Sequence, residues 1–174
     1  MTLPNLLSLC RYGLAIAMVL AVYREQWLWS AIILWLAIAS DVADGILARR
    51  LEQVTQVGGV LDHSADAVFV SSLLGTLAWQ GLIPIVLPVL VVLAFIQYVL
   101  DSSTLKGQPL RASYLGRYNG IAYFVLGGWP VMQQALGLYL LSDNVITYLA
   151  WGLVASTLIS MVDRAFALYR LRRG

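Results

Sequence analysis

Charged residues are scarce in this chain of 174 residues: they make up 11% of it, whereas hydrophobic residues make up 60%. Soluble domains carry roughly 25% charged residues, so the polar surface that a soluble fold needs is missing here. The mean hydropathy of +0.80 agrees with this. The composition therefore excludes an ordinary soluble domain and predicts an integral membrane protein in contact with a lipid bilayer.

Cysteine and histidine are almost absent, with one residue of each. Cys10 alone cannot form a disulfide within the chain, and with His63 it does not supply the several soft ligands of a zinc or copper site. The net charge of +2 is too small to indicate a nucleic-acid partner. Gly/Ser linkers, long charge runs and fixed-period repeats are missing too, so we predict a single domain over residues 1–174.

The apolar residues fall into six segments, each close to the roughly 20 residues that a helix needs to cross the hydrocarbon core. These segments are 7–23, 27–49, 58–79, 83–100, 115–136 and 145–169. We therefore predict an all-α fold, an integral membrane bundle of six transmembrane helices. If the N-terminus is cytosolic, ten of the eleven basic residues lie on that side and only Arg24 lies opposite. The positive-inside rule then places both termini in the cytoplasm.

Four aspartates interrupt the second and third apolar segments, and each pair belongs to a helical stripe that also contains small residues. The first stripe consists of Asp41, Asp44, Gly45, Ala48 and Arg49. The second stripe consists of Gly58, Asp62 and Asp66, at steps of four. Two facing helices would aim the four carboxylates at one point, which is prohibitive without compensation. Hard divalent cations would compensate the charge, and such cations attract phosphate or pyrophosphate.

Each of these features also has a simpler interpretation. A single aspartate within a span can be an interhelical hydrogen-bonding group or a proton relay. The small residues of the two stripes could be helix contacts, and for the neighbouring Gly59 we favour that role. Arg49 could anchor its helix end at the lipid headgroups. Four aspartates at this spacing nevertheless favour a divalent metal site over these alternatives.

Residues 41–66 read D-x2-D-G-x2-A-R-x8-G-x3-D-x3-D, and this pattern resembles the signature of the CDP-alcohol phosphatidyltransferases. The resemblance implies a membrane enzyme of phospholipid biosynthesis. Such an enzyme transfers a phosphatidyl group from CDP-diacylglycerol to a polar alcohol and releases CMP. The resemblance also favours a homodimer, and we expect a bacterial inner membrane with the active site facing the cytosol.

The same resemblance implies roles for the residues of the two stripes. It assigns a two-metal site for Mg²⁺ or Mn²⁺ to Asp41, Asp44, Asp62 and Asp66. It further assigns to Asp66 the removal of the proton from the acceptor hydroxyl. It implies that the nucleotide of the donor is bordered by Gly45, Ala48 and Gly58. Arg49 stands beside the metal cluster, which favours a contact with the pyrophosphate.

Residues 4–11 resemble the opening of the family, an interfacial segment that leads into the first span. Asn5, Ser8 and Arg11 fall three residues apart and share one side of a helix. They could form a lid or wall over the nucleotide, with Asn5 and Ser8 as donor contacts, or they could anchor the chain at the membrane surface. Both interpretations stay open at the level of the sequence.

The acceptor site is expected at the cytosolic ends of the last three spans, where Arg111, Arg117 and Arg164 are available. Residues 111–117 resemble a stretch of phosphatidylglycerophosphate synthases, and arginine forks suit phosphate. Asp163 is the expected partner of Arg164. Plain membrane anchoring is the alternative for all three arginines.

Glycerol 3-phosphate is the leading acceptor, and inositol phosphate or another polar alcohol is the alternative. His63 and Ala67 depart from residues that are frequent in the family, which leaves the acceptor open. Two other classes of protein compete with this interpretation. A membrane prenyltransferase also binds pyrophosphate through aspartates and metal, and a cation transporter could carry a carboxylate site within the bilayer.

Overall fold

The computed structural model describes residues 3–50, 56–104 and 114–171, which form helices joined by short turns. The helices are α1 (Leu3–Tyr23), α2 (Trp27–Arg50), α3 (Gln56–Trp79), α4 (Val86–Thr104), α5 (Tyr114–Leu136) and α6 (Asp143–Leu171). The predicted all-α fold of six helices is therefore confirmed. The largest boundary differences are four residues, at the start of α1 and at the end of α4.

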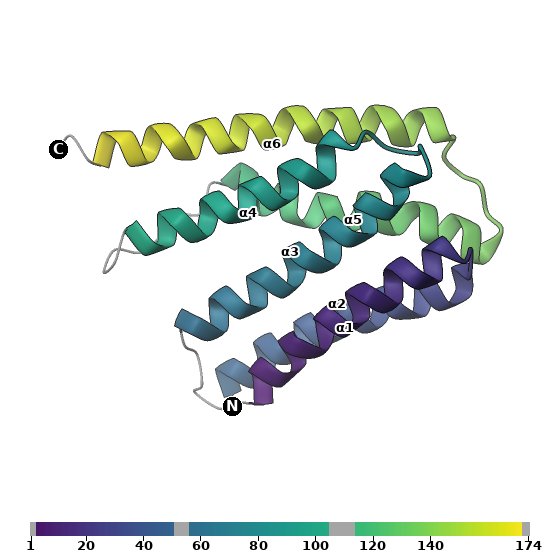
Figure 1. Ribbon diagram of the computed structural model, residues 1–174, viewed down its shortest axis with the longest axis horizontal. Coiled ribbons are helices and arrows are strands. Elements are labelled where there is room, and N and C mark those ends of the chain that lie inside the picture. The colour runs from purple at the N-terminus through teal and green to yellow at the C-terminus, as the bar shows by residue number, and fades with distance from the viewer. Residues whose placement is uncertain (1–2, 51–55, 105–113, 172–174) are drawn as a thin grey trace.

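Successive helices run in opposite directions, so α1 begins and α6 ends on the same side of the bundle (Figure 1). Helix α3 is central and packs against α1, α4 and α5. Helix α1 packs closely against both α2 and α3, while α2 also contacts α5, and α6 contacts α4 and α5. The two helices that carry the aspartates are therefore joined through α1.

Residues with a positive φ end three of the helices. Gly81 follows α3 with a φ of 79°. Its N–H donates to the carbonyl of Ala78, and the N–H of Leu82 donates to the carbonyl of Leu77. This pair of bonds is a Schellman motif, which satisfies carbonyls that the helix end leaves free. Gly137 ends α5 with a φ of 65°, and Glu25 ends α1 with a φ of 55°.

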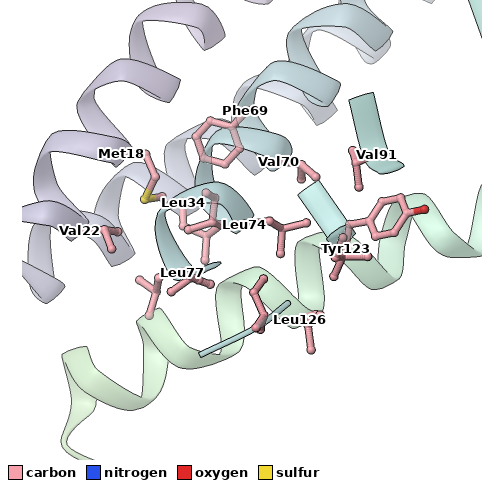
Figure 2. Packing of buried hydrophobic residues seen from close by; sticks show 14 of the residues in the cluster. Met18, Val22, Leu34, Phe69, Val70, Leu74, Leu77, Val91, Tyr123 and Leu126 are labelled. Carbon is pink, nitrogen blue, oxygen red and sulfur yellow. The ribbon is translucent and has the colours of Figure 1, made fainter. Parts of the chain in front are cut away.

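The apolar core is built around α3, as Figure 2 shows. Its fully buried side chains include Met18, Val22, Phe69, Leu73, Leu74, Leu77 and Leu87. Gly128 lets α5 approach α2 closely, because a Cβ added to it would lie 2.9 Å from Cδ2 of Leu34. Small residues at such contacts are typical of helix packing in membranes.

The outside of the bundle is apolar. Large exposed side chains include Ile16, Leu28, Trp35, Ile159 and Phe166. Among the described residues, three helices are long and apolar enough to cross a membrane, over Leu6–Tyr23, Trp27–Leu47 and Asp143–Tyr169. An exterior of this kind is expected of a helical bundle that lies in lipid. We predicted six membrane spans, and these three helices account for half of them. That the other three helices also cross the membrane stays a prediction.

Candidate active site

A fully buried arginine lies at the centre of the acidic cluster. Nη2 of Arg11 donates to Oδ2 of Asp44 at 2.7 Å. Nη1 lies 3.1 Å from Oδ1 of Asp62 and 3.4 Å from Oδ1 of Asp41, and it also donates to Oδ1 of Asp66. The structure thus brings together all four aspartates that the sequence pattern singled out. They converge on one guanidinium from α1, a role that the sequence did not predict.

Helix α1 reaches the cluster because it packs against both α2 and α3. Ser8, one turn before Arg11, donates through Oγ to Oδ2 of Asp44 at 3.2 Å. Nε of Arg11 donates to Oγ of Ser40 at 3.4 Å. Arginine suits this position because its planar fork offers several donors at once. The idea that Arg11 anchors the chain at the membrane surface is wrong, since its side chain is 0% exposed.

Three of the carboxylates are placed to hold a metal ion. One oxygen each of Asp41, Asp62 and Asp66 lies within 4.8 Å of the others. Oxygen donors of this kind suit hard cations such as Mg²⁺ and Mn²⁺. A single guanidinium cannot offset the charge of four carboxylates, so the donor set fits a divalent cation. Asp44 lies deeper and is only 3% exposed, with Arg11 and Ser8 as its partners.

Two of the residues expected to bind the donor, Gly45 and Gly58, lie in the described parts of α2 and α3. Gly45 and Gly58 are half-buried. Gly59 is exposed, and among the described residues nothing lies within 4 Å of a Cβ added to it. Within the described part of this bundle, Gly59 therefore makes no close helix contact. The side chains of Asn5, Ala48 and Arg49, and the whole of Arg111, lie outside the residues that the structure describes.

A cavity of about 620 Å³ begins at the acidic cluster, and residues of α2 to α6 line it. Asp41 and Asp66 belong to its lining. Arg117 from α5 and Arg164 from α6 line the same cavity. Two of the three predicted acceptor arginines thus line the same cavity as Asp41 and Asp66.

Arg164 is held in this cavity by residues of α4. Its Nε lies 3.3 Å from Oδ2 of Asp101, and its guanidinium carbon lies 5.1 Å from the centre of the Tyr98 ring. An ion pair and a cation–π contact together fix its orientation. The expected partner Asp163 is exposed, so that prediction is wrong and Asp101 takes its place.

His63 joins the two parts of the site, which the sequence did not indicate. Its Nδ1 lies 3.8 Å from Oδ2 of Asp62, and its ring centre lies 5.3 Å from that of Tyr98. His63 and Tyr98 both line the cavity. The position after the third aspartate therefore faces the space where an acceptor would lie.

Comparison with known proteins identifies the class. The chain belongs to the CDP-alcohol phosphatidyltransferase family, whose family model matches residues 1–162. It is 34% identical over 91 residues to a cardiolipin synthase (CMP-forming) of Streptomyces coelicolor, covering 49% of this chain and 42% of that protein. It is 41% identical over 69 residues to a CDP-diacylglycerol–glycerol-3-phosphate 3-phosphatidyltransferase of Aquifex aeolicus, covering 40% of this chain and 39% of that protein.

A longer match covers 92% of this chain and 75% of a phosphatidylinositol phosphate synthase of Corynebacterium glutamicum, at 26% identity over 171 residues. By contrast, the matches to the Streptomyces coelicolor and Aquifex aeolicus relatives each span less than half of the relative's length. Family membership confirms the resemblance drawn from residues 41–66. It argues against a prenyltransferase or a cation transporter, and together with the apolar helices it makes the chain a membrane protein.

Proposed function

We propose that the protein transfers a phosphatidyl group from CDP-diacylglycerol to a polar alcohol and releases CMP, in phospholipid biosynthesis. The observation that carries this proposal is one cavity lined both by carboxylates of the family motif and by two arginines. Asp41 and Asp66 stand at its acidic end, and Arg117 and Arg164 supply its positive charge. A diphosphate donor and a polar acceptor can meet in such a space.

The proposed reaction is a single displacement at phosphorus. The acceptor hydroxyl oxygen attacks the lipid-side phosphorus of the donor and forms a new P–O bond. Asp66 takes the hydroxyl proton, since it belongs both to the acidic cluster and to the cavity lining. The bond between this phosphorus and the oxygen of CMP breaks, and CMP leaves with the electron pair.

Asp41, Asp62 and Asp66 are the residues that would hold a Mg²⁺ or Mn²⁺ ion, with Asp44 beside them for a second ion. When bound, divalent cations neutralise the diphosphate and stabilise the departing CMP. Ser8 keeps Asp44 in place through its hydrogen bond. Gly45 and Gly58, together with Asn5, Ala48 and Arg49, are proposed to contact the nucleotide and pyrophosphate.

Glycerol 3-phosphate is the acceptor that we favour, and inositol phosphate is the alternative. Both are phosphorylated, which fits the two arginines of the cavity, and Arg111 is proposed to join them. The Aquifex aeolicus relative is named for glycerol 3-phosphate and the Corynebacterium glutamicum relative for an inositol phosphate product.

We further propose six transmembrane helices with both termini in the cytosol, a bacterial inner membrane and a homodimer. An even number of membrane crossings is supported by the positions of the first and last helix ends, because α1 begins and α6 ends on the same side of the bundle (Figure 1). The distribution of basic residues supports the orientation.

The direct test is a CMP-release assay with purified protein, CDP-diacylglycerol and a panel of acceptors. The panel contains glycerol 3-phosphate, inositol 1-phosphate, phosphatidylglycerol and unphosphorylated inositol. We expect CMP release that depends on a divalent cation and is fastest with glycerol 3-phosphate. Absence of CMP release with every acceptor would refute the proposed reaction.

A further inference from the structure

Three buried polar atoms in the described part of the chain have no hydrogen-bond partner: Oε1 of Gln97, Nδ2 of Asn119 and Nη2 of Arg164. All three residues line the cavity of about 620 Å³. Buried polar groups are nearly always paired, because leaving one unpaired is costly. Three such groups around one cavity offer hydrogen bonds to a polar ligand that displaces water from it.

The amide of Gln97 is held in one orientation. Its Nε2 donates to the carbonyl of Met161 on α6 at 3.0 Å. This bond leaves Oε1 as the free atom, and a carbonyl oxygen only accepts hydrogen bonds. The group that completes Gln97 must therefore be a donor, such as a hydroxyl.

In Asn119 the amide oxygen is bonded and the amide nitrogen is free, the reverse of Gln97. Its Oδ1 accepts a hydrogen bond from Oγ of Ser156 at 2.6 Å, which leaves Nδ2 free to donate. The residue is 4% exposed. Arg164 is oriented by Asp101 through Nε, which leaves Nη2 free to donate. Asn119 and Arg164 thus require ligand oxygens that accept.

We propose that Gln97 and Asn119 determine acceptor specificity, and that with Arg164 they select a phosphorylated polyol with a free hydroxyl besides the one that reacts. This inference rests on the proposed phosphatidyl transfer. Gln97 accepts a hydrogen bond from the second hydroxyl, Asn119 donates to a hydroxyl or phosphate oxygen, and Arg164 binds the phosphate. A site built to hydrogen-bond a hydroxyl discriminates strongly against an analogue without it, because the protein group is then left unpaired.

The test compares glycerol 3-phosphate with 3-hydroxypropyl phosphate, which lacks the second hydroxyl. In the unaltered protein, we expect kcat/KM for glycerol 3-phosphate to exceed that for the analogue by about tenfold or more. Gln97→Met removes the accepting oxygen at similar volume, so the preference should fall toward equality. Asn119→Leu should raise the KM for the acceptor about tenfold. The KM for CDP-diacylglycerol should change less than twofold in both variants.

The matched control is Gln134→Met, which makes the same change of side chain outside the cavity. Gln134 is exposed on α5, where its Oε1 accepts a hydrogen bond from the hydroxyl of Tyr139 at 2.9 Å. Surface substitutions of this kind usually have small effects, so acceptor preference should stay unchanged. If the favoured acceptor is inositol 1-phosphate, its monodeoxy analogues replace 3-hydroxypropyl phosphate in the same comparison.

Two results would overturn the inference while the proposed function stands. One is that the Gln97→Met variant releases CMP and prefers the acceptor over its deoxy analogue by the same factor as the unaltered protein. The other is a preference for phosphatidylglycerol over every free phosphorylated polyol, which would assign the cavity to a lipid acceptor. Absence of CMP release from the unaltered protein would instead refute the proposed function on which the inference rests.

Discussion

Arg11 donates to Asp44 at 2.7 Å in the interior of the bundle, with 0% of the first side chain and 4% of the second exposed. This contact joins α1 to α2, while the contacts of Arg11 with Asp62 and Asp66 join α1 to α3. One guanidinium therefore holds together the two helices that carry the acidic motif. It also partly neutralises the carboxylates, which is the role that a metal ion is proposed to complete.

The first prediction concerns this buried counter-charge. Arg11→Gln should lower the free energy of unfolding by about 3 to 5 kcal/mol in excess chelator, because it leaves the buried carboxylate of Asp44 without its charged partner. In saturating Mg²⁺ the loss should be smaller, since a bound cation compensates the same charge. Thermal unfolding of the purified protein in detergent, with and without metal, measures both values.

Arg24→Gln is the control for this experiment, because Arg24 is exposed at the turn between α1 and α2. It should change stability by less than about 0.5 kcal/mol in either condition. An equal loss for Arg11→Gln with and without Mg²⁺ would show that Arg11 and the metal do not compensate the same carboxylates.

The second prediction separates the proton acceptor from the other carboxylates. Asp66→Asn should lower kcat by about 10²- to 10⁴-fold, because an amide occupies the site but cannot take the proton. Asp62→Asn should instead raise the metal concentration needed for half-maximal activity, since it removes a charged ligand. Donor binding can be followed by protection from thermal unfolding. Near-normal turnover by the Asp66→Asn variant would exclude Asp66 as the base.

The aspartate spacing predicted much of the site, because residues three and four apart share a helix face whatever the helix packs against. Asp41 and Asp66 do meet, as that spacing indicated. The sequence could not predict that α1 would join the two stripes, because periodicity gives a helix its buried face but not its neighbours. The three-residue step from Ser8 to Arg11 was the available signal.

The residues of the acceptor site were harder to predict, because they lie on different helices and only helix packing brings them together. Gln97 and Asn119 are isolated polar residues in apolar segments, and no local pattern links them. Only the packing of α4 and α5 against α6 brings them to one cavity. Asp101 on α4 likewise pairs with Arg164 on α6, whereas Asp163, next to Arg164 in the sequence, is exposed. Polar residues within apolar spans are the general signal that could have found all three.

The third prediction tests the nucleotide side of the site. Gly45→Leu or Gly58→Leu should raise the KM for CDP-diacylglycerol by about tenfold, since a bulky side chain would enter the space beside the carboxylates. Gly59→Leu is the matched control, because Gly59 is exposed and an added Cβ there meets nothing among the described residues. The measurement is donor KM together with the unfolding temperature. Equal changes in stability alone for all three variants would indicate helix packing instead of donor contact.

The last prediction asks whether the cavity arginines bind an acceptor phosphate or only anchor the protein. Arg164→Gln should raise the KM for glycerol 3-phosphate by roughly tenfold to a hundredfold, because a charge-assisted hydrogen bond contributes about 1.5 to 3 kcal/mol. Arg117→Gln should act in the same direction but less strongly, since Arg117 is exposed and more hydrated. The KM for the donor should hardly change in either variant.

Asp101→Asn distinguishes binding from positioning in the same assay. Asp101 orients the guanidinium of Arg164 without belonging to the cavity lining, so its loss should weaken acceptor binding less than the loss of Arg164 itself. Arg24→Gln is the control, because Arg24 follows the end of α1, away from the acidic cluster, and is exposed. It should leave the Michaelis constants for donor and acceptor unchanged. Unaltered acceptor constants in the Arg117 and Arg164 variants would exclude both arginines from the acceptor site. Activity with an unphosphorylated alcohol alone would overturn the choice of glycerol 3-phosphate, while CMP release would still support phosphatidyl transfer.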